Sequence, residues 1–483
     1  MKLLSVQEFA RQARDGSLSV EDHMEKFLKE AKKNNAEFNH FNLLAEKNAL
    51  EQAKELDRQI KKEKGKIKGK LLGVPLSVKD AICVKGMEST GGSKILSGYK
   101  PLFDATVVAR AKAEGAIIVG KTAQDEFGFG SFSVNVGIGF KVPKNPFDKN
   151  RCTGGSSGGS GGITAQTSLT HISFGESTGG SIAAPASFCG VTGFTPTYGR
   201  VSRYGLMDYA SSCDKIGPMA KTVEESALLL EVIAGADEKE STTLVQKTDD
   251  YEKACGEGVK GMKIGVVKEL IDWQGIDKKV SGACWNAIKK LEGEGAKVEN
   301  VSLPLNAKYA VAAYYMITTA EASTNLAKYC GMRYGFEKEL KGNFDEYFSS
   351  VRSDAFGEEA KRRIIIGTFA RMSGYRDAYY LNAMKVRTKL INEFKQAFKK
   401  FSVLAHPTMP FIAPKFSEIE KLTPLQHYHA DQCTVPANLA GIPHLSVPAG
   451  TEKDLPIGLL LSADHLEEKE LFKVGSALEE VVK

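Results

Sequence analysis

The sequence predicts an α/β protein whose central β-sheet is covered by helices. Residues 71–78 and 116–119 are short apolar runs, which are typical of buried strands. Residues 104–114, between them, have a helical pattern that ends at Gly115. A strand, a helix and a strand in this order are typical of a parallel sheet with covering helices.

The other elements follow in order along the chain. The N-terminal segment is predicted to be helical, because Ser5-x-x-Glu8 and Ser19-x-x-Asp22 resemble capping boxes, and its last helix should end by Gly65. Further strands are expected at 262–267, 296–303, 402–405, 445–447 and 457–461, and helices at 221–235, 280–291, most of 305–400, and 467–482. Because the late strands can rejoin the early sheet, we expect a single domain over 1–483. Its parts are N-terminal helices (1–65), a catalytic core (66–304), a mainly helical insertion (305–400) and a return to the sheet (401–483).

Composition excludes several classes of protein. The chain has 483 residues, of which 42% are hydrophobic and 26% charged, as in globular proteins. It has no apolar run of membrane-spanning length and a polar N-terminus, so we expect a cytoplasmic protein without membrane contact. None of the eight cysteines forms a C-x-x-C pair, which argues against a metal site. The basic run 61–70 is more typical of a solvated linker than of a nucleic-acid patch.

Three short stretches can carry chemistry together. They are Lys79 at the end of a predicted strand, the stretch 154–160 around Ser156, and the stretch 177–181 ending in Ser181. Burial disfavours the charged form of a lysine, so Lys79 can serve as the base that a serine nucleophile needs. Glycines before Ser181 allow backbone amides to converge on one oxyanion. Each stretch alone is typical of a surface lysine or a glycine-rich loop, and no Gly-Lys-Ser/Thr follows that would make a P-loop.

A different serine hydrolase remains an alternative. The segments 175–179 and 155–159 both match the G-x-S-x-G nucleophile elbow, with Ser177 or Ser157 as nucleophile. That fold also needs an upstream His-Gly-Gly-type loop, which is absent, and a downstream acid and histidine. Five histidines are available downstream, at 406, 427, 429, 444 and 465, but nothing in the sequence singles one out.

These stretches resemble the amidase-signature family, whose hallmark is a lysine followed by two glycine-serine segments. Within that family the chain is most similar to the A-type (glutaminase) subunits of tRNA-dependent aspartyl/glutamyl amidotransferases, over nearly its whole length. The family-level stretches are 73–82 and 120–127, and the stretches typical of the glutaminase subunits are 321–326, 361–364, 373–380 and 431–441.

The resemblance implies a fold and a set of catalytic roles. The fold would be the amidase-signature fold, a mixed central sheet with helices on both faces. Ser181 would attack a carboxamide carbon, and Ser156, after a cis peptide bond from Gly155, would relay its proton to Lys79. The oxyanion would be held by backbone amides from Thr178, Gly179 and Gly180 to Ser181 itself.

The resemblance also implies how glutamine is recognised. Arg362 or Arg363 would bind the α-carboxylate, since arginine suits bidentate carboxylate binding. Asp431 would bind the α-amino group. Without the resemblance, the arginine pair would be taken for a solvated helix face and Asp431 for a helix cap.

The implied role is to supply ammonia to a partner. A B-type subunit that binds tRNA and uses ATP and Mg²⁺, with a small C-type subunit, would convert Asp-tRNA(Asn) or Glu-tRNA(Gln) to the amidated form. No cofactor is implied for this chain. The alternatives are a stand-alone amidase acting on a small carboxamide and a weakened, mainly structural subunit. Three departures from the family pattern bear on this role: Ser177 replaces an aspartate, Ala183 replaces an arginine, and the link from Ser156 to Ser181 is one residue longer.

Overall fold

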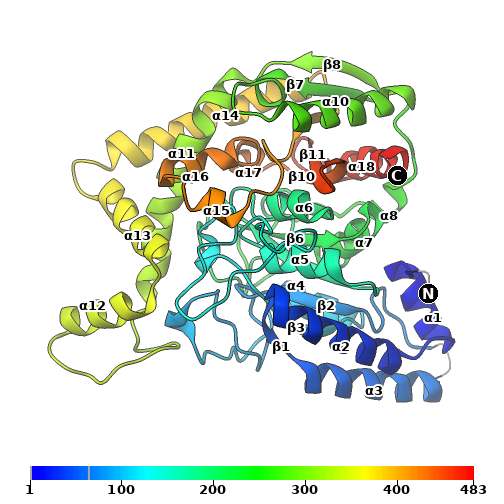
Figure 1. Cartoon of the computed structure of the whole chain (residues 1–483), viewed down its shortest axis with the longest axis horizontal. Helices are drawn as coiled ribbons and strands as arrows, with labels where there is room; N and C mark the ends of the chain where they lie inside the picture. Colours follow the sequence, from blue (N-terminus) through cyan, green and yellow to red (C-terminus); the bar gives the residue numbers. More distant parts are fainter. Residues whose placement is uncertain (1–2, 64–65, 483) are drawn as a thin grey trace.

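The computed structural model describes residues 3–63 and 66–482, and a mixed sheet of 11 strands runs through its centre (Figure 1). The strand order is β1-β3-β2-β4-β6-β5-β10-β11-β9-β7-β8. The strands are β1 (Phe41–Leu44), β2 (Pro75–Lys79), β3 (Ile117–Thr122), β4 (Ile172–Ser177), β5 (Thr192–Thr195), β6 (Lys215–Ala220), β7 (Lys263–Val267), β8 (Lys297–Val301), β9 (Val403–Pro407), β10 (His444–Glu452) and β11 (Leu455–Ser462).

Helices connect and cover these strands. The α-helices are α1 (Val6–Asp15), α2 (Val20–Phe38), α3 (Glu46–Glu63), α4 (Thr106–Ala113), α5 (Gly158–Gln166), α6 (Ala183–Cys189), α7 (Val223–Ile233), α8 (Tyr251–Ala254), α9 (Lys268–Ile271), α10 (Lys278–Gly293), α11 (Pro304–Asn325), α12 (Phe344–Ala355), α13 (Glu358–Arg371), α14 (Asn382–Phe398), α15 (Phe416–Ile419), α16 (Pro424–His429), α17 (Val435–Ala440) and α18 (Glu468–Val482). Shorter turns are η1 (Lys94–Leu96), η2 (Glu126–Gly128), η3 (Leu326–Lys328), η4 (Asp377–Leu381) and η5 (Ala430–Gln432).

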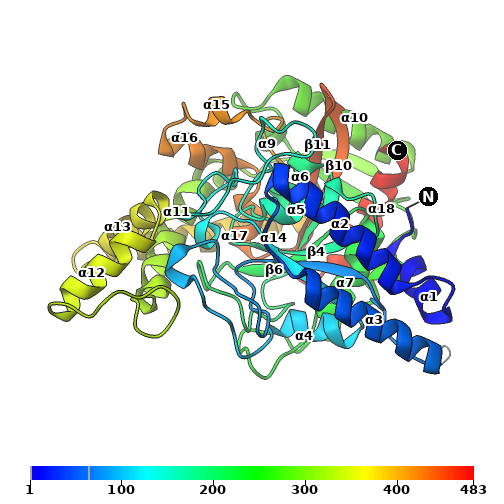
Figure 2. The same ribbon diagram turned by 60° about the horizontal axis from the view of Figure 1, so that its bottom comes forward.

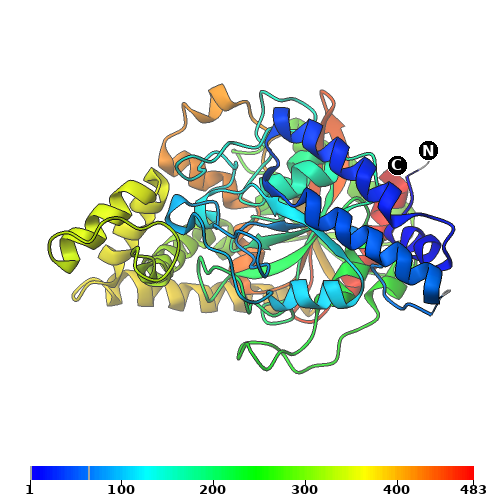
Figure 3. The ribbon, with the colours of Figure 1, turned by 90° about the horizontal axis from the view of Figure 1, so that it is seen from below.

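The middle of the sheet is buried on both faces. Strand β2 pairs in parallel with β3 and β4, and every residue of these three strands is buried. Helices α5 and α6 lie on one side of the sheet and α4 and α7 on the other (Figures 2 and 3). Strands covered on both faces read as continuous apolar runs rather than alternating ones, which is why β2 and β3 are visible in the sequence.

Two peripheral groups of helices lie at opposite ends of the molecule. Helices α1 to α3 lie along one end, while α12 and α13 extend from the other (Figures 1 and 2). The predicted starts at Ser5 and Ser19 are correct, since both side chains accept a bond from the helix backbone as N-caps. The predicted stop at Gly65 lies outside the described residues. No helix in the described ranges is long and apolar enough to cross a bilayer.

The predicted fold class is confirmed. Strands β9, β10 and β11 rejoin the sheet beside β5 and β7, as expected from the late apolar runs. The sheet combines parallel and antiparallel pairs: β2–β4 is parallel, while β4–β6 and β5–β10 are antiparallel. This order places the carboxyl end of β2 directly beside the carboxyl end of β4, so the residues that follow these strands share one edge.

Candidate active site

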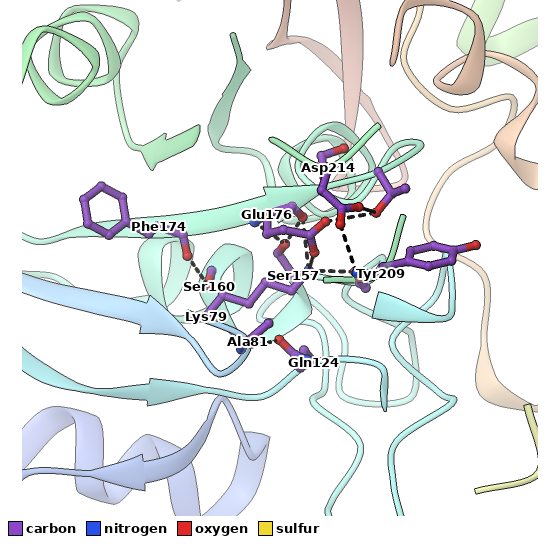
Figure 4. Close-up of polar contacts among 12 residues, drawn as sticks. Lys79, Ala81, Gln124, Ser157, Ser160, Phe174, Glu176, Tyr209 and Asp214 are labelled. Carbon is purple, nitrogen blue, oxygen red and sulfur yellow. Dashed lines mark hydrogen bonds and ion pairs between the residues drawn. The ribbon is translucent and has the colours of Figure 1, made fainter. Parts of the chain in front are cut away.

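Lys79 is the last residue of β2, and its side chain is completely buried. Its Nζ lies 2.7 Å from the Ser156 Oγ, 3.0 Å from the Glu176 carbonyl oxygen and 2.8 Å from the Glu176 Oε2. Figure 4 shows the lysine side chain running from its strand toward Glu176 on β4. The lysine and Ser156, 77 positions apart in sequence, are therefore in direct contact.

Ser156 lies in the turn before helix α5, and the peptide bond from Gly155 to Ser156 is cis, as the resemblance implies. The next residue, Ser157, forms hydrogen bonds between this turn and the segment that carries Ser181. The Ser157 amide donates to the Ser181 carbonyl oxygen at 3.1 Å, and the Ser157 Oγ donates to the Glu176 carbonyl oxygen at 3.0 Å. The backbone of Ser156 thus lies beside that of Ser181.

Ser181 lies between β4 and helix α6 and is 6% exposed. Two glycines precede it because neighbouring side chains leave no space: a Cβ at Gly179 would overlap the Tyr314 ring, and one at Gly180 would overlap the Thr434 hydroxyl. The backbone amides of Gly179, Gly180 and Ser181 have no acceptor among the described residues. Amides in this state can bind an oxyanion.

A second carboxylate extends the network beyond Glu176. The Thr178 hydroxyl lies 3.0 Å from the Glu176 Oε1 and 2.7 Å from the Asp214 Oδ1. Burial, and then the negative charge of Glu176, raise the pKa of Asp214 well above its usual value. The Asp214 carboxyl also accepts from the amides of Tyr209 and Ala210. Neither acid was among the site residues predicted from the sequence.

Asp125 organises the loop on the other side of Ser156. It is buried and accepts from the amides of Ser133 and Asn135 at 3.1 and 2.8 Å. Burial raises the pKa of Asp125 to about 6, while the charge of Lys79 acts in the opposite direction. Its own amide donates to the Ser156 carbonyl oxygen at 3.3 Å. The loop that carries Ser131 is therefore fixed against the Ser156 turn.

A cavity of about 300 Å³ lies next to this loop. Arg362 and Arg363 of α13 both line it, but they differ in burial: the Arg362 side chain is 40% exposed and that of Arg363 only 3%. The walls are Gly130, Ser131, Asn135, Tyr315, Glu358, Glu359, Arg362, Arg363, Leu422, Pro424, His427 and Tyr428. The volume suits a small polar molecule of amino-acid size.

Arg363 is held by an acid and by aromatic rings. Its Nε donates to the Glu359 Oε1 at 2.8 Å and its Nη1 to the Tyr209 hydroxyl at 2.6 Å. The guanidinium also lies 5.3 Å from the ring centre of Tyr315 and 5.6 Å from that of Tyr428. Rings and guanidinium at this separation attract one another, which fixes the arginine in the cavity wall.

Asp431 lies in the short turn η5 and is 6% exposed. The Tyr315 hydroxyl donates to the Asp431 Oδ2 at 2.6 Å. Burial raises the pKa of Asp431, while Ser131, Tyr315 and the charge of Arg363 act in the opposite direction. Asp431 thus contacts the cavity wall through Tyr315, which lines the cavity together with Arg363, and its role toward glutamine remains a prediction.

The rival elbow receives no support from the geometry. The Ser177 hydroxyl is buried and donates to the Asn438 Oδ1 at 3.3 Å, and Ser157 bonds backbone groups. In the described ranges, the hydrogen bonds of the histidine rings go to main-chain carbonyls or to side chains other than these two serines. Within the described part of the chain, no group of three or more His, Cys, Asp or Glu side chains could hold a metal ion.

The fold, and a buried lysine bonded to a serine beside a second glycine-serine turn, are those of an amidase. Residues 22–472 match the Amidase family, and the chain belongs to it, as its amidase signature indicates. It is 44% identical over 478 residues to the second A-type subunit of the glutamyl-tRNA(Gln) amidotransferase of Clostridium acetobutylicum, covering 99% of this chain and 98% of that protein. The A-type subunit of the same enzyme from Halothermothrix orenii is 47% identical over 411 residues, 85% of each chain. The crystal structure of the Thermotoga maritima A-type subunit is 38% identical, with a TM-score of 0.78 over 95% of this chain and 91% of that one.

Proposed function

We propose that the chain is the glutamine-hydrolysing A-type subunit of a tRNA-dependent amidotransferase. The observation that carries the chemistry is the 2.7 Å contact between the Lys79 Nζ and the Ser156 Oγ, next to the turn of Ser181. The substrate and the assembly are supported by identities of 44% and 47% to A-type subunits that cover most of both chains.

Ser181 is the proposed nucleophile. Its Oγ attacks the side-chain carbonyl carbon of glutamine and gives its proton to the Ser156 Oγ, whose own proton passes to Lys79. Amides of residues 178–181 stabilise the oxyanion. The C–N bond then breaks, the stored proton returns through Ser156, and ammonia leaves. Water attacks the acyl-Ser181 ester by the same proton route, and glutamate is released.

The cavity lined by Arg363 is the proposed glutamine site, and its wall residue Ser131 accepts from the amide of Gly155, the residue before Ser156. Arg363 suits the α-carboxylate best, because it is buried and held in place, whereas Arg362 is half exposed. Asp431 suits the α-amino group, since a buried carboxylate gives a charge-assisted bond to an ammonium. Both are charged groups that a simple amide cannot use, so they would favour glutamine over a simple amide.

The remaining parts of the proposal concern the assembly. Ammonia would pass to a B-type subunit, which works with a small C-type subunit to amidate Asp-tRNA(Asn) or Glu-tRNA(Gln) at the expense of ATP. ATP and Mg²⁺ belong to the B-type subunit, whereas this chain acts without a cofactor. A cytoplasmic location follows from such a role in translation.

The test is glutamine hydrolysis by the purified chain, alone and with co-purified partners, followed by ammonia release. Ser181→Ala should abolish turnover without lowering thermal stability, and Ser177→Ala, which removes the rival nucleophile, should retain it. A Ser181→Ala enzyme with wild-type turnover would refute the nucleophile. Hydrolysis of propionamide without any of glutamine would instead indicate a stand-alone amidase.

A further inference from the structure

The base of this site has an acidic partner. The Lys79 Nζ has three acceptors at 2.7 to 3.0 Å, and two of them belong to Glu176. An ammonium has three N–H donors and no acceptor. In the ion-paired form, in which Lys79 is an ammonium facing the Glu176 carboxylate at 2.8 Å, the nitrogen has no free lone pair for the Ser156 proton. Lys79 must therefore lose one proton as it gains another.

Glu176 is the group that can receive that proton. Of the three acceptors of Lys79, the Ser156 hydroxyl is the proton donor in the reaction and the Glu176 carbonyl oxygen is a poor base. The Glu176 Oε2, at 2.8 Å, is a carboxylate oxygen. Both side chains are almost entirely buried, with exposures of 0% and 4%. In such surroundings an ion pair and its neutral form can approach one another in free energy, because desolvation offsets the attraction between the charges.

We propose that Lys79 and Glu176 act as one two-residue base, in which Glu176 is the terminal proton acceptor. This inference rests on the proposed function. The Ser181 O–H bond breaks as its oxygen attacks the carboxamide, and that proton moves to the Ser156 Oγ. The original Ser156 proton moves to the Lys79 Nζ, and one N–H proton of Lys79 moves to the Glu176 Oε2. The same protons return in reverse order to the leaving nitrogen, so Lys79 remains an ammonium throughout.

Other titratable groups surround the pair. Asp214, just before β6, reaches Glu176 through the Thr178 hydroxyl, and burial together with Glu176 raises the pKa of Asp214. Asp125 lies at the start of the η2 loop, and the charge of Lys79 acts to lower its pKa against the effect of burial. On the other side of β2, the Lys121 Nζ lies 3.4 Å from the Asp80 Oδ1, and this buried ion pair compensates its own charges.

The Thr178 hydroxyl makes the two acids interdependent. It has a single hydrogen, so it can donate to Glu176 or to Asp214 but not to both. When Glu176 takes up a proton it no longer needs that hydrogen, and Thr178 can donate to Asp214 alone. Asp214 thus helps Glu176 to alternate between its two states and acts as a positioning residue.

The test is the pH dependence of kcat/KM in Glu176→Gln. The amide keeps the shape but cannot accept a proton, so Lys79 would have to act alone and only where it is itself unprotonated. We expect turnover at pH 7 to fall about 100-fold or more, and the acidic limb of the profile to move to higher pH. If Glu176 were only a counter-ion that suppresses the base, its removal would free the lysine. The limb would then move to lower pH, with equal or higher turnover, and that result would overturn the proposal.

Two further variants keep the result interpretable. Glu176→Asp retains a carboxylate, so the acidic limb of its pH profile should stay at the wild-type pH although its rate falls. If the limb of Glu176→Asp moved as far as that of Glu176→Gln, a carboxylate would not be the proton acceptor. Glu225→Gln removes another buried carboxylate, which accepts from the amides of Val6 and Thr222, and should leave the profile unchanged. Profiles are measured with glutamine and with propionamide. If the wild-type enzyme does not hydrolyse glutamine, the proposed function is refuted. The displacement of the acidic limb in Glu176→Gln, measured with propionamide, would still test the role of Glu176.

Discussion

Lys215 is a fully buried lysine that serves no step of the proposed reaction. It lies at the start of β6, and its Nζ donates to the Ile442 carbonyl oxygen at 3.3 Å. Burial lowers the pKa of Lys215 from 10.5 to about 7, and the nearby charge of Arg387 adds to this effect. Holding this lysine therefore costs the folded state free energy at neutral pH.

The size and sign of that cost follow from the shift. From 10.5 to about 7 is 3.5 pKa units, which at 1.36 kcal/mol per unit is about 5 kcal/mol. Between about pH 7 and 10.5 the unfolded chain binds this proton and the folded chain does not. Stability should therefore rise with pH across this window, and the cost should be complete below pH 7.

Lys215→Met tests this reasoning. Methionine has a similar shape and no charge, so it removes the cost but also the bond to Ile442, worth about 1 kcal/mol, and it packs imperfectly, at about another 1 kcal/mol. We expect the free energy of unfolding at pH 7 to increase by about 3 kcal/mol. The measurement is urea unfolding at several pH values from 6 to 10.

The pH series separates this explanation from a general gain in packing. Wild type should gain about 4 kcal/mol between pH 7 and 10 relative to Lys215→Met, so the difference between them should shrink with rising pH and change sign near about pH 9. The exposed Lys289 on α10 provides the control, since Lys289→Met should change neither stability nor its pH dependence by more than about 0.5 kcal/mol. A constant difference between wild type and Lys215→Met at all pH values would refute the assigned burial cost.

Three further predictions concern the site. Asp431→Asn should raise KM for glutamine about 10- to 100-fold and leave KM for propionamide unchanged, and equal effects on both amides would mean that Asp431 is only structural. Because burial raises the pKa of Asp431, the wild-type KM for glutamine should also rise as the pH falls. The Glu126 Oε2 accepts from the Gly357 amide at the start of α13, the helix that carries Arg363. Glu126→Gln should therefore raise KM for glutamine several-fold in steady-state assays. An unchanged KM would show that this bond does not position α13 for binding. In a double-mutant cycle on Ser177→Asp and Ala183→Arg, each single change should lower thermal stability and the double should recover it; additive losses would exclude coupling.

The sequence predicts the fold where strands are apolar throughout. Strands β2, β3, β7, β9 and β11 and the first part of β10 were predicted within a few residues, since most of their residues are buried and turns bound them. Strand β8 was also predicted, although none of its five residues is buried. Strand β1 was missed because it lies inside the segment 1–65, which was predicted to consist of helices. Strands β5 and β6 were missed for physical reasons. Strand β5 has four residues within a glycine-rich region, and β6 contains Gly217 and Pro218, which are typical of turns. The structure accommodates Pro218 opposite Phe174.

The site was predicted only as far as local motifs reach. Glycines followed by a serine form a continuous pattern, so Ser156 and Ser181 are visible in the chain. Glu176 contacts Lys79 across 97 positions, and Asp214 contacts Thr178 across 36, so no local pattern relates them. Such contacts depend on strand order, which places β2, β4 and β6 side by side.

Strand geometry bears on two of the three departures from the family pattern, those at positions 177 and 183. Successive residues of a strand point to opposite faces of the sheet, so a carboxylate at 176 rather than 177 faces the other side. Glu176 points to Lys79, whereas Ser177 bonds Asn438 and lies opposite Lys215 in the ladder. With no carboxylate at 177, an arginine at the fully buried position of Ala183 would be a charge without a partner, at a cost of about 3–5 kcal/mol. If the two positions are coupled, the loss of the arginine is the expected consequence of moving the acid by one residue, and the acid at 176 is the one that contacts Lys79.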